Sequence, residues 1–351
     1  MTGRQRLSYA AKLTLSHALY YAGLLQLWQR IVMRRKAVVL MYHRVLTAEQ
    51  RERSASHPAL IVDCETFARH MRLLKRRFVP LTADEFAERM EQNRPFPDSA
   101  CLITFDDGWR DNLTNALPVL ETHRLPALVF LPVNYIGRQR LFWQEALVHL
   151  LSRTVAVVRT HPDRKARFAE LLAPYDLVHT LDIAEENPRA AVTEAVGSQK
   201  RFDRPKIEAL LAGLAAELQV RLEDFAKVDG FIDWEEAQAM QSRGITFGGH
   251  GAEHLLLTQV SSDEAASEIR ASRDVLAARL GAGPVTFSYP NGYWTPEVAA
   301  TVQAEGYRLG FVTRRGFVDC RDDRFAVRRL NVHEAVTSTA PMFLARVVGL
   351  L

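Results

Sequence analysis

Cysteine is scarce in this chain: Cys64, Cys101 and Cys320 are the three among 351 residues, and no two of them form a C-x-x-C pair. This spacing excludes a disulfide framework and a cysteine zinc site, and it is typical of proteins from reducing compartments. The composition, with 48% hydrophobic and 25% charged residues, allows a large core that needs no cross-links. We therefore expect a cytoplasmic location.

Acidic residues are absent from residues 1–36, which carry seven Lys or Arg. Removing those seven charges from the net charge of +4 leaves the rest of the chain at −3. A basic surface for nucleic acid is therefore not a property of the body of the chain, and no platform of basic and aromatic residues occurs outside this terminus. We expect no nucleic-acid partner.

A long hydrophobic run is also missing. The longest uncharged stretch of the terminus, residues 13–29, is seventeen residues long and is interrupted by Ser16, His17, Gln26 and Gln29. A spanning helix needs about 20 apolar residues, and a signal peptide needs an unbroken apolar core, so both fit poorly. Two interpretations stay open for residues 1–36, which we expect to form a basic amphipathic helix. In the first, the helix lies on the anionic inner face of a membrane, with Arg34, Arg35 and Lys36 near the lipid headgroups. In the second, it packs on its own domain.

Short apolar runs alternate with helical patterns along much of the remaining chain. The expected strands lie at 37–45, 78–81, 100–105, 127–131, 244–249, 284–289 and 307–313. The expected helices lie at 64–77, 112–123, 233–243, 262–280 and 296–305, and Thr82 with Glu85 forms a capping box for one more. This alternation predicts parallel β/α units, in which functional groups gather at the carboxyl ends of the strands.

The alternation stops between residues 138 and 229. Helical patterns dominate there, with residues 155–158 as the main strand-like exception, and residues 47–58 read as a polar loop. We predict three parts: the N-terminal helix (1–36), a β/α domain (37–137 and 230–351), and a mostly helical insertion (138–229) that is not expected to carry catalytic residues.

Two adjacent carboxylates follow the expected strand at 100–105. Asp106 and Asp107 stand in the stretch ITFDDG, where they repel each other unless a positive charge lies beside them. His250 and His254, four residues apart, follow a later strand. Such a pair arises easily by chance among eleven histidines. Together with Asp107, however, it makes a two-histidine, one-carboxylate set that suits a divalent metal, and Asp106 is then free to take a proton from activated water.

A third motif, FSYPNGYW at 287–294, ends another expected strand. Pro290, Asn291 and Gly292 predict a turn whose main-chain N–H groups point to a cavity and stabilise an oxyanion; a plain β-turn is the alternative.

The three motifs in this order, T-F-D-D-G, H-x-x-x-H and F-x-Y-P-x-G, resemble the polysaccharide deacetylase family, the NodB-homology domain of family-4 carbohydrate esterases. The stretches VVLMYHRV, GYRLGFVT and RRLNV match as well, so the resemblance covers about residues 37–137 and 230–333. It implies an α/β fold, a distorted (β/α) barrel. It also implies a divalent metal, most often zinc and otherwise cobalt or nickel, and hydrolysis of an N-acetyl or related acyl group on an amino sugar.

Residue roles follow from the same resemblance. Asp107, His250 and His254 would ligate the metal, Asp106 would be the general base, and the main-chain N–H of Tyr289 would hold the oxyanion. The chain departs from the family pattern in three places. Gly251 stands where a Ser or Thr usually steadies the loop. Ser288 stands where an Arg usually orients the base, and we predict Arg329 as its replacement. The general acid is either His43 or His333.

Aromatic residues beside the motifs, Trp109, Tyr293 and Trp294, either stack on sugar rings or belong to the core, and Pro290 and Asn291 complete the expected substrate-binding group. The sequence thus predicts a metal-dependent N-deacetylase of a polysaccharide, oligosaccharide or lipid-linked glycan. The alternative is an inactive carbohydrate-binding or scaffold member of the same fold. Nothing in the sequence names the sugar, the metal or the oligomeric state.

Overall fold

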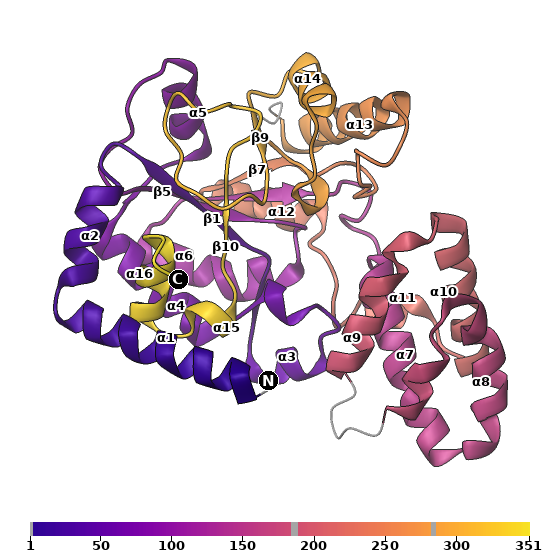
Figure 1. Cartoon of the computed structure of the whole chain (residues 1–351). Helices are drawn as coiled ribbons and strands as arrows, with labels where there is room; N and C mark the ends of the chain where they lie inside the picture. The colour runs from indigo at the N-terminus through magenta and orange to yellow at the C-terminus, as the bar shows by residue number, and fades with distance from the viewer. Residues whose placement is uncertain (1–2, 184–188, 282–285) are drawn as a thin grey trace. The chain divides into compact units, whose positions relative to one another are not determined.

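The computed structural model describes residues 3–183, 189–281 and 286–351 (Figure 1). Contacts divide the chain into two compact units. Unit 1 comprises Met1–Ala48, Pro58–Gly137 and Phe231–Leu351, and unit 2 comprises Glu49–His57 and Arg138–Gly230.

Unit 1 is built on a parallel sheet. Within the described residues this sheet has eight strands, in the order β10-β1-β5-β6-β7-β8-β9, with β4 paired to β5. The strands are β1 (Ala37–Tyr42), β4 (Val79–Pro80), β5 (Ala100–Phe105), β6 (Ala127–Leu131), β7 (Ile245–Gly249), β8 (Thr286–Ser288), β9 (Leu309–Phe311) and β10 (Leu330–Asn331). A separate pair joins β2 (Arg44–Leu46) to β3 (Ile61–Asp63). Every residue of β1, β5 and β6 is buried, which explains their unbroken apolar sequences.

The last strands return to the first one. Val327 pairs in parallel with Phe311 of β9, and three residues later Leu330 pairs with Leu40 of β1. Residues 327–331 therefore connect the two ends of the sheet and curl it into the distorted (β/α) barrel that the sequence predicted.

Helices fill the connections between the strands, and the expected β/α alternation is confirmed. Those of unit 1 are α1 (Gly3–Tyr21), α2 (Leu24–Val32), α4 (Cys64–Arg77), α5 (Ala83–Glu91), α6 (Leu117–His123), α12 (Trp234–Ser242), α13 (Ser262–Leu280), α14 (Pro296–Ala304), α15 (Glu334–Thr337) and α16 (Ala340–Val347). A π-helical turn, Asn112–Ala116, precedes α6. The capping box is present as predicted, because Thr82 and Glu85 each bind the other's main-chain N–H.

Unit 2 is helical. It contains most of α3 (Ala48–Arg53), together with α7 (Trp143–Thr160), α8 (Lys165–Leu172), α9 (Arg189–Gly197), α10 (Arg204–Leu218) and α11 (Leu222–Phe225), around one apolar cluster. The strand predicted at 155–158 is wrong, since these residues belong to α7, where Leu151, Val155 and Val158 form one buried face at helical spacing. The loop predicted at 47–58 is also wrong in part, because it contains α3.

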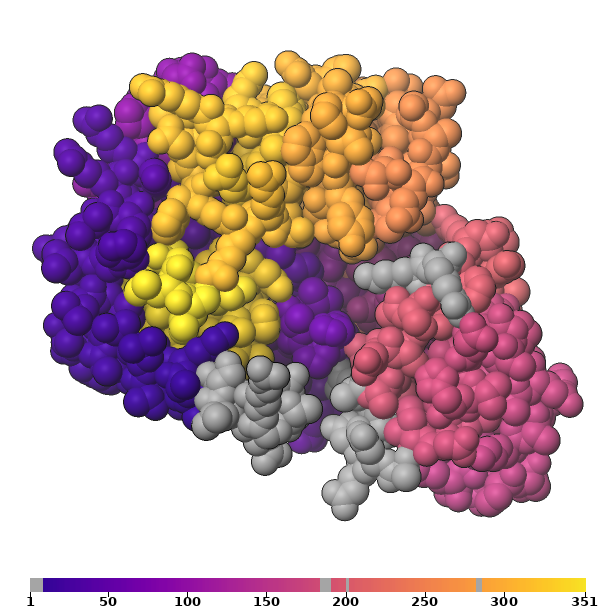
Figure 2. Space-filling view, in the orientation of Figure 1, coloured from indigo at the N-terminus to yellow at the C-terminus, as the bar shows by residue number. Residues whose placement is uncertain are grey.

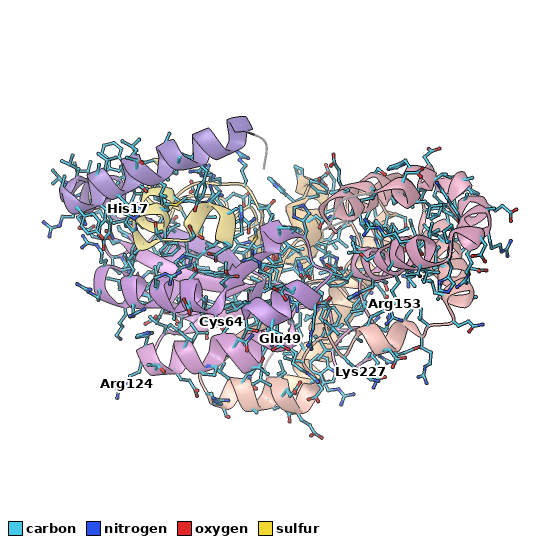
Figure 3. The ribbon with its side chains drawn as sticks, turned by 90° about the horizontal axis from the view of Figure 1, so that it is seen from below. His17, Glu49, Cys64, Arg124, Arg153 and Lys227 are labelled. Carbon is cyan, nitrogen blue, oxygen red and sulfur yellow. The ribbon has the colours of Figure 1, made fainter. Side chains whose placement is uncertain are left out.

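The N-terminal segment forms two helices rather than one. Gly23 has a φ of 76°, a left-handed conformation that glycine adopts without strain, and it separates α1 from α2. Helix α1 contacts α16, and the Tyr9 hydroxyl lies 2.9 Å from Ser338 Oγ. Figure 2 shows the indigo N-terminal and yellow C-terminal residues side by side, and Figure 3 shows α1, with His17, along one edge of unit 1. None of the described helices has the length and apolar character needed to cross a bilayer.

Candidate active site and metal centre

The motif residues meet at one edge of the sheet. His43 follows β1, Asp106 and Asp107 follow β5, His250 follows β7, and Ser288 ends β8. All of these strands are parallel, so their carboxyl ends lie at the same edge. The arrangement explains why motifs separated by more than a hundred residues face each other.

Asp107, His250 and His254 form a candidate metal site. One ligand atom from each lies within 4.8 Å of the other two. The Asp107 Oδ1 atom is 3.5 Å from His250 Nε2 and 3.6 Å from His254 Nε2. The structure thus brings together the three residues that the sequence singled out.

Neighbouring hydrogen bonds orient two of these ligands. The Trp109 indole donates to Asp107 Oδ2 at 3.0 Å, so the other carboxylate oxygen faces the histidines. His250 Nδ1 lies 2.7 Å from the Ser288 carbonyl, which can only accept, so Nδ1 carries a proton and Nε2 is the ring nitrogen that faces Asp107. Imidazole rings oriented by such outer partners and a carboxylate are the donors that zinc and similar divalent ions take. The residues fit a divalent metal.

Both Asp107 and His254 have a left-handed backbone, with φ values of 75° and 56°. This conformation is uncommon for residues other than glycine and often marks functional sites. Gly108, with a φ of 70°, completes the turn after Asp107. A Cβ atom there would lie 2.4 Å from Leu131 Cδ2, so any other residue would strain the backbone and require Leu131 to move.

Without a metal, the candidate ligands Asp107 and His254 have different protonation states. Burial raises the pKa of Asp107, but the hydrogen bond from His250 and the nearby His254 outweigh it, so its pKa lies well below the ordinary value. Burial lowers the pKa of His254 to about 4, helped by His250. Asp107 is therefore ionised and His254 is neutral at pH 7, which is the state in which both bind a cation.

Arg329 holds Asp106. Its two terminal nitrogens donate to Asp106 Oδ1 at 2.6 Å and Oδ2 at 2.8 Å, and one of them also donates to Ser288 Oγ at 2.8 Å. The guanidinium is fully buried, and its Nε donates to Val312 O. Burial raises the pKa of Asp106, but Arg329, His250 and His43 together hold it below its usual value. Asp106 is thus an ionised carboxylate in a fixed orientation, and Arg329 approaches it from the segment that closes the barrel.

His43 lies beside Asp106, with Nε2 3.9 Å from Asp106 Oδ2. Asn112 donates to the His43 carbonyl at 2.8 Å and so steadies the loop after β1. Burial lowers the pKa of His43, against the opposite influence of Asp106 and Asp107.

His333 is the N-cap residue of α15, and its carbonyl accepts from Thr337 Oγ1. The pairing of Met41 with Asn331 places His43 and His333 at equivalent positions beyond neighbouring strands.

Two of the predicted site residues have other roles in the structure. The Tyr289 main-chain N–H donates to Phe311 O at 3.1 Å, and its hydroxyl donates to Phe325 O. Because β8 pairs with β9, Tyr289 cannot supply the predicted oxyanion donor. Trp109 is fully buried, stacked on Phe231 and covered by the Arg44 guanidinium, 4.2 Å from the ring centre. It positions Asp107 and cannot stack on a sugar.

The other residues of the substrate-binding group differ in exposure. Tyr293 is 55% exposed, whereas Pro290 is buried. Trp294 is partly buried and packs against an apolar cluster of unit 1. Asn291 is partly exposed with a φ of 56°, a third left-handed residue in a motif turn. Tyr293 is thus the group member with the most surface available to a ligand.

Glu268 is a site-supporting residue that the sequence did not suggest. It extends from α13, and its Oε2 accepts from the main-chain N–H groups of Ala252 and Glu253 at 2.9 and 2.8 Å. A Cβ on Gly251 would lie 3.1 Å from the same oxygen. The carboxylate of Glu268 thus steadies the loop between the two histidines, where no Ser or Thr is present. An acidic residue on the buried face of α13 was the signal that could have revealed it.

A second missed group lies behind Trp109. Arg44 Nε donates to Asp111 Oδ2 at 2.6 Å, and the main-chain N–H of Val45 donates to Asp111 Oδ1 at 2.6 Å. Both charged side chains are buried. Through the cation–π contact of Arg44, this pair fixes the indole that orients Asp107.

Comparisons with known proteins identify a family and a fold. A family model described as "Polysaccharide deacetylase" matches residues 93–310, more than half of the chain. YxkH of Bacillus subtilis (strain 168), which is named as a polysaccharide deacetylase, is 26% identical over 172 residues, covering 48% of this chain and 52% of the relative. The chain therefore matches about half the length of that curated relative.

Two solved structures share the fold. The deacetylase PplD of Streptococcus pyogenes, in complex with acetate, is similar with a TM-score of 0.56 and 16% identity, over 89% of this chain and 98% of PplD. IcaB of Ammonifex degensii is similar with a TM-score of 0.56 and 17% identity, over 90% of this chain and 97% of IcaB.

Proposed function

This chain belongs to the polysaccharide deacetylase family, and we propose that it is a metal-dependent hydrolase that removes N-acetyl groups from the amino sugars of a glycan. The observation that carries the proposal is the convergence of Asp107, His250 and His254 beside a carboxylate, Asp106, that Arg329 fixes in place.

Asp107 Oδ1, His250 Nε2 and His254 are the groups that would hold the metal. Two imidazoles and one carboxylate suit Zn²⁺, with Co²⁺ and Ni²⁺ as ions of similar preference. When bound, such an ion supplies a Lewis acid that polarises the acyl carbonyl and makes water more acidic.

Asp106 is the group that takes the proton from the attacking water. Its two oxygens are held by Arg329, so it is ionised and cannot rotate away. General base catalysis of this kind contributes about 10²- to 10⁴-fold to a rate.

His43 is our choice for the group that donates a proton to the leaving nitrogen, because its Nε2 lies next to Asp106. After turnover Asp106 carries a proton and His43 has lost one, and the proton returns when the two side chains, 3.9 Å apart in this structure, come within hydrogen-bond distance or share a water. His333 is the alternative donor.

The substrate we propose is an N-acetylated glycan, with acetate as the product. The similar deacetylase PplD was solved in complex with acetate, which supports acetyl over formyl. Tyr293 is the exposed aromatic residue that could stack on a sugar ring. In the turn, the N–H groups of Gly292 and Tyr293 already donate to Tyr289 O and Pro290 O, which leaves the N–H of Asn291 as the candidate oxyanion donor.

An inactive member of the family is the competing function, suggested by Gly251 and Ser288. Both departures have a replacement in the structure. Glu268 holds the loop at Gly251, and Arg329 holds the base where Ser288 cannot. These two replacements favour an active hydrolase over the inactive alternative.

Acetate release from N-acetylglucosamine oligomers tests the proposal. Protein stripped with a chelator should release no acetate, and Zn²⁺, Co²⁺ or Ni²⁺ should restore release. Asp106→Asn should keep the metal and lose about 10²- to 10⁴-fold in rate, whereas Asp107→Asn should lose both metal and activity. Metal-loaded protein that binds the oligomers but releases no acetyl or formyl group would establish the inactive alternative.

A further inference from the structure

Exposed apolar side chains are concentrated on the N-terminal helices. Of the ten large hydrophobic residues that are exposed in the described part of the chain, six belong to α1 and α2. They are Tyr21 (79% exposed), Ile31 (60%), Leu27 (56%), Leu15 (54%), Leu24 (51%) and Trp28 (41%). Scattered apolar residues need no explanation, but a cluster of this kind marks an interaction surface.

Helix α2 carries apolar side chains on both of its faces, because Leu25 is fully buried while four others are exposed. Leu24, Leu27, Trp28 and Ile31, at spacings of three and four, face outward. The polar Gln29 faces inward, 3% exposed, and its amide donates to Arg77 O and Ser99 Oγ at 3.1 Å. A helix folding against water would bury its apolar stripe. Burying one such side chain is worth about 1.5–3 kcal/mol, so this outward face is suited to a non-aqueous partner.

The outward face is a built part of unit 1 rather than a loose tail. The Trp28 indole donates to Val348 O at 3.3 Å, and Tyr9 contacts Ser338. The Gln29 amide, bonded on the body side, fixes the rotation of α2 about its axis. We name the exposed side chains Leu15, Tyr21, Leu24, Leu27, Trp28 and Ile31 the α1–α2 surface.

Positive charge surrounds the α1–α2 surface. Residues 1–36 contain seven Lys or Arg and no Asp or Glu, and Arg30, Arg34 and Arg35 are exposed. The last turn of α4 adds Lys75, Arg76 and Arg77, and Arg77 donates to Gln29 Oε1. Asp98 accepts from the main-chain N–H of Arg35, so one acidic group lies at this rim. An apolar face with a basic rim matches the acyl chains and phosphates of anionic lipid.

We propose that the α1–α2 surface rests on an anionic lipid membrane, with the apolar side chains inserted and the basic rim on the headgroups. A second copy of this chain fits less well, since a two-fold contact would bring two basic rims together. This proposal is independent of the proposed deacetylase function.

Flotation with vesicles tests it, using phosphatidylcholine alone and phosphatidylcholine mixed with phosphatidylglycerol. The full-length protein should float with the mixed vesicles. The double variant Leu27→Ser/Ile31→Ser should lose about tenfold or more in bound fraction, because two inserted side chains are replaced. The double variant Arg34→Glu/Arg35→Glu should lose its preference for the anionic vesicles. Val228→Ser, at an exposed apolar residue of unit 2, is the matched control and should float like the wild type.

Equal flotation of all variants, or no flotation of the wild type, overturns the proposal. A dimer that the Leu27→Ser/Ile31→Ser variant abolishes, without any vesicle binding by the wild type, assigns the surface to a second copy instead. Circular dichroism of each variant checks that these surface changes leave the fold intact. Metal content should stay at the wild-type value, which separates this test from that of the hydrolase.

Discussion

Unit 1 and unit 2 both bury charged groups, but the groups have different surroundings. In unit 2 the carboxylate of Asp229 is fully buried and accepts from Ala55 N at 2.6 Å and His149 Nε2 at 2.9 Å. Those bonds tie the short segment Glu49–His57 to the helices. In unit 1 the ligand atoms of Asp107, His250 and His254 point toward each other and share a common centre.

Left-handed backbone occurs in both units, and in unit 1 it is also found outside the motifs, at Arg35, Asn93, Ser99 and Arg124. Asp176 and Gln219 of unit 2 are left-handed at the ends of helices, where this conformation terminates a helix. Asp107, His254 and Asn291 of unit 1 are left-handed in the turns of the three motifs. Burial of charge alone therefore does not distinguish a candidate site from a structural contact. What distinguishes the candidate site is that its ligand atoms point toward one another and that two of the ligands stand in left-handed turns.

The largest expected effect separates the two candidate acids of unit 1. His43→Ala should lower kcat by about 10²- to 10⁴-fold, because the leaving nitrogen then lacks its proton donor. His333→Ala should retain most of the activity. Acetate release and metal content of both variants check this, and metal must remain bound in each. If His333→Ala shows the loss instead, the roles are reversed, and full activity in both variants removes histidine as the acid.

The next prediction compares the loss of stability when a buried charged residue is replaced in each unit, Arg329 in unit 1 and Asp229 in unit 2. Arg329→Met should cost about 3–5 kcal/mol in unfolding free energy, because Asp106 is left as an uncompensated buried charge. It should also lower activity, since the base loses its orientation. Asp229→Asn in unit 2 should cost about 1–3 kcal/mol by weakening two hydrogen bonds.

Urea denaturation and acetate release, measured on both variants, check this pair. Asp229→Asn should keep the wild-type rate and metal content, as expected for a structural contact. An Arg329→Met variant with unchanged activity would show that the guanidinium serves only the fold.

A smaller effect concerns Glu268, which supports the loop between the two histidines. Glu268→Ala should weaken metal binding about 10- to 100-fold, as changes to groups behind metal ligands do, with little change in kcat at saturating metal. Isothermal titration with Zn²⁺ measures the affinity. Gly251→Ser should not restore it, because Gly251 has a φ of 76° that disfavours any side chain. Unchanged affinity in Glu268→Ala would assign the loop's order to other contacts.

The smallest effect is a pH dependence of stability. Burial lowers the pKa of His70 to about 3, so its ring is neutral in the folded protein. In the unfolded chain its pKa is about 6.5. The unfolded state therefore binds one more proton between these values, and stability is lost as the pH falls below about 6.5, by up to about 1.4 kcal/mol per pH unit.

Urea denaturation of wild type and His70→Gln between pH 7 and pH 4.5 measures this contribution. The difference between the two slopes isolates His70 from the carboxylates that also titrate. Parallel slopes would mean that the ring is protonated in the fold.

Local patterns in the sequence were sufficient for much of this protein. Apolar runs with β-branched residues marked β1, β5 and β6, and the ends of β5 and β7 identified Asp106, Asp107 and His250 as site candidates. The π-helical turn and the break at Gly23 were not visible, because helical periodicity is the same on both sides of them. The run at 155–158 misled because an apolar stretch of four residues fits a strand and a buried helix face equally well.

By itself, the sequence determined the β/α order and the identity of the chemical groups, because strand periodicity, turn residues and ligand types are properties of neighbouring positions. Only the tertiary structure decided which groups share a contact. Arg329, which the family resemblance suggested, reaches Asp106, 223 residues away, because residues 327–331 close the barrel. Tyr289 loses its free N–H because β8 pairs with β9, and Gln29 of α2 lies inward, where it binds Arg77 O, while Leu27 and Ile31 are exposed. Such contacts depend on long-range strand pairing and packing, which no local pattern encodes.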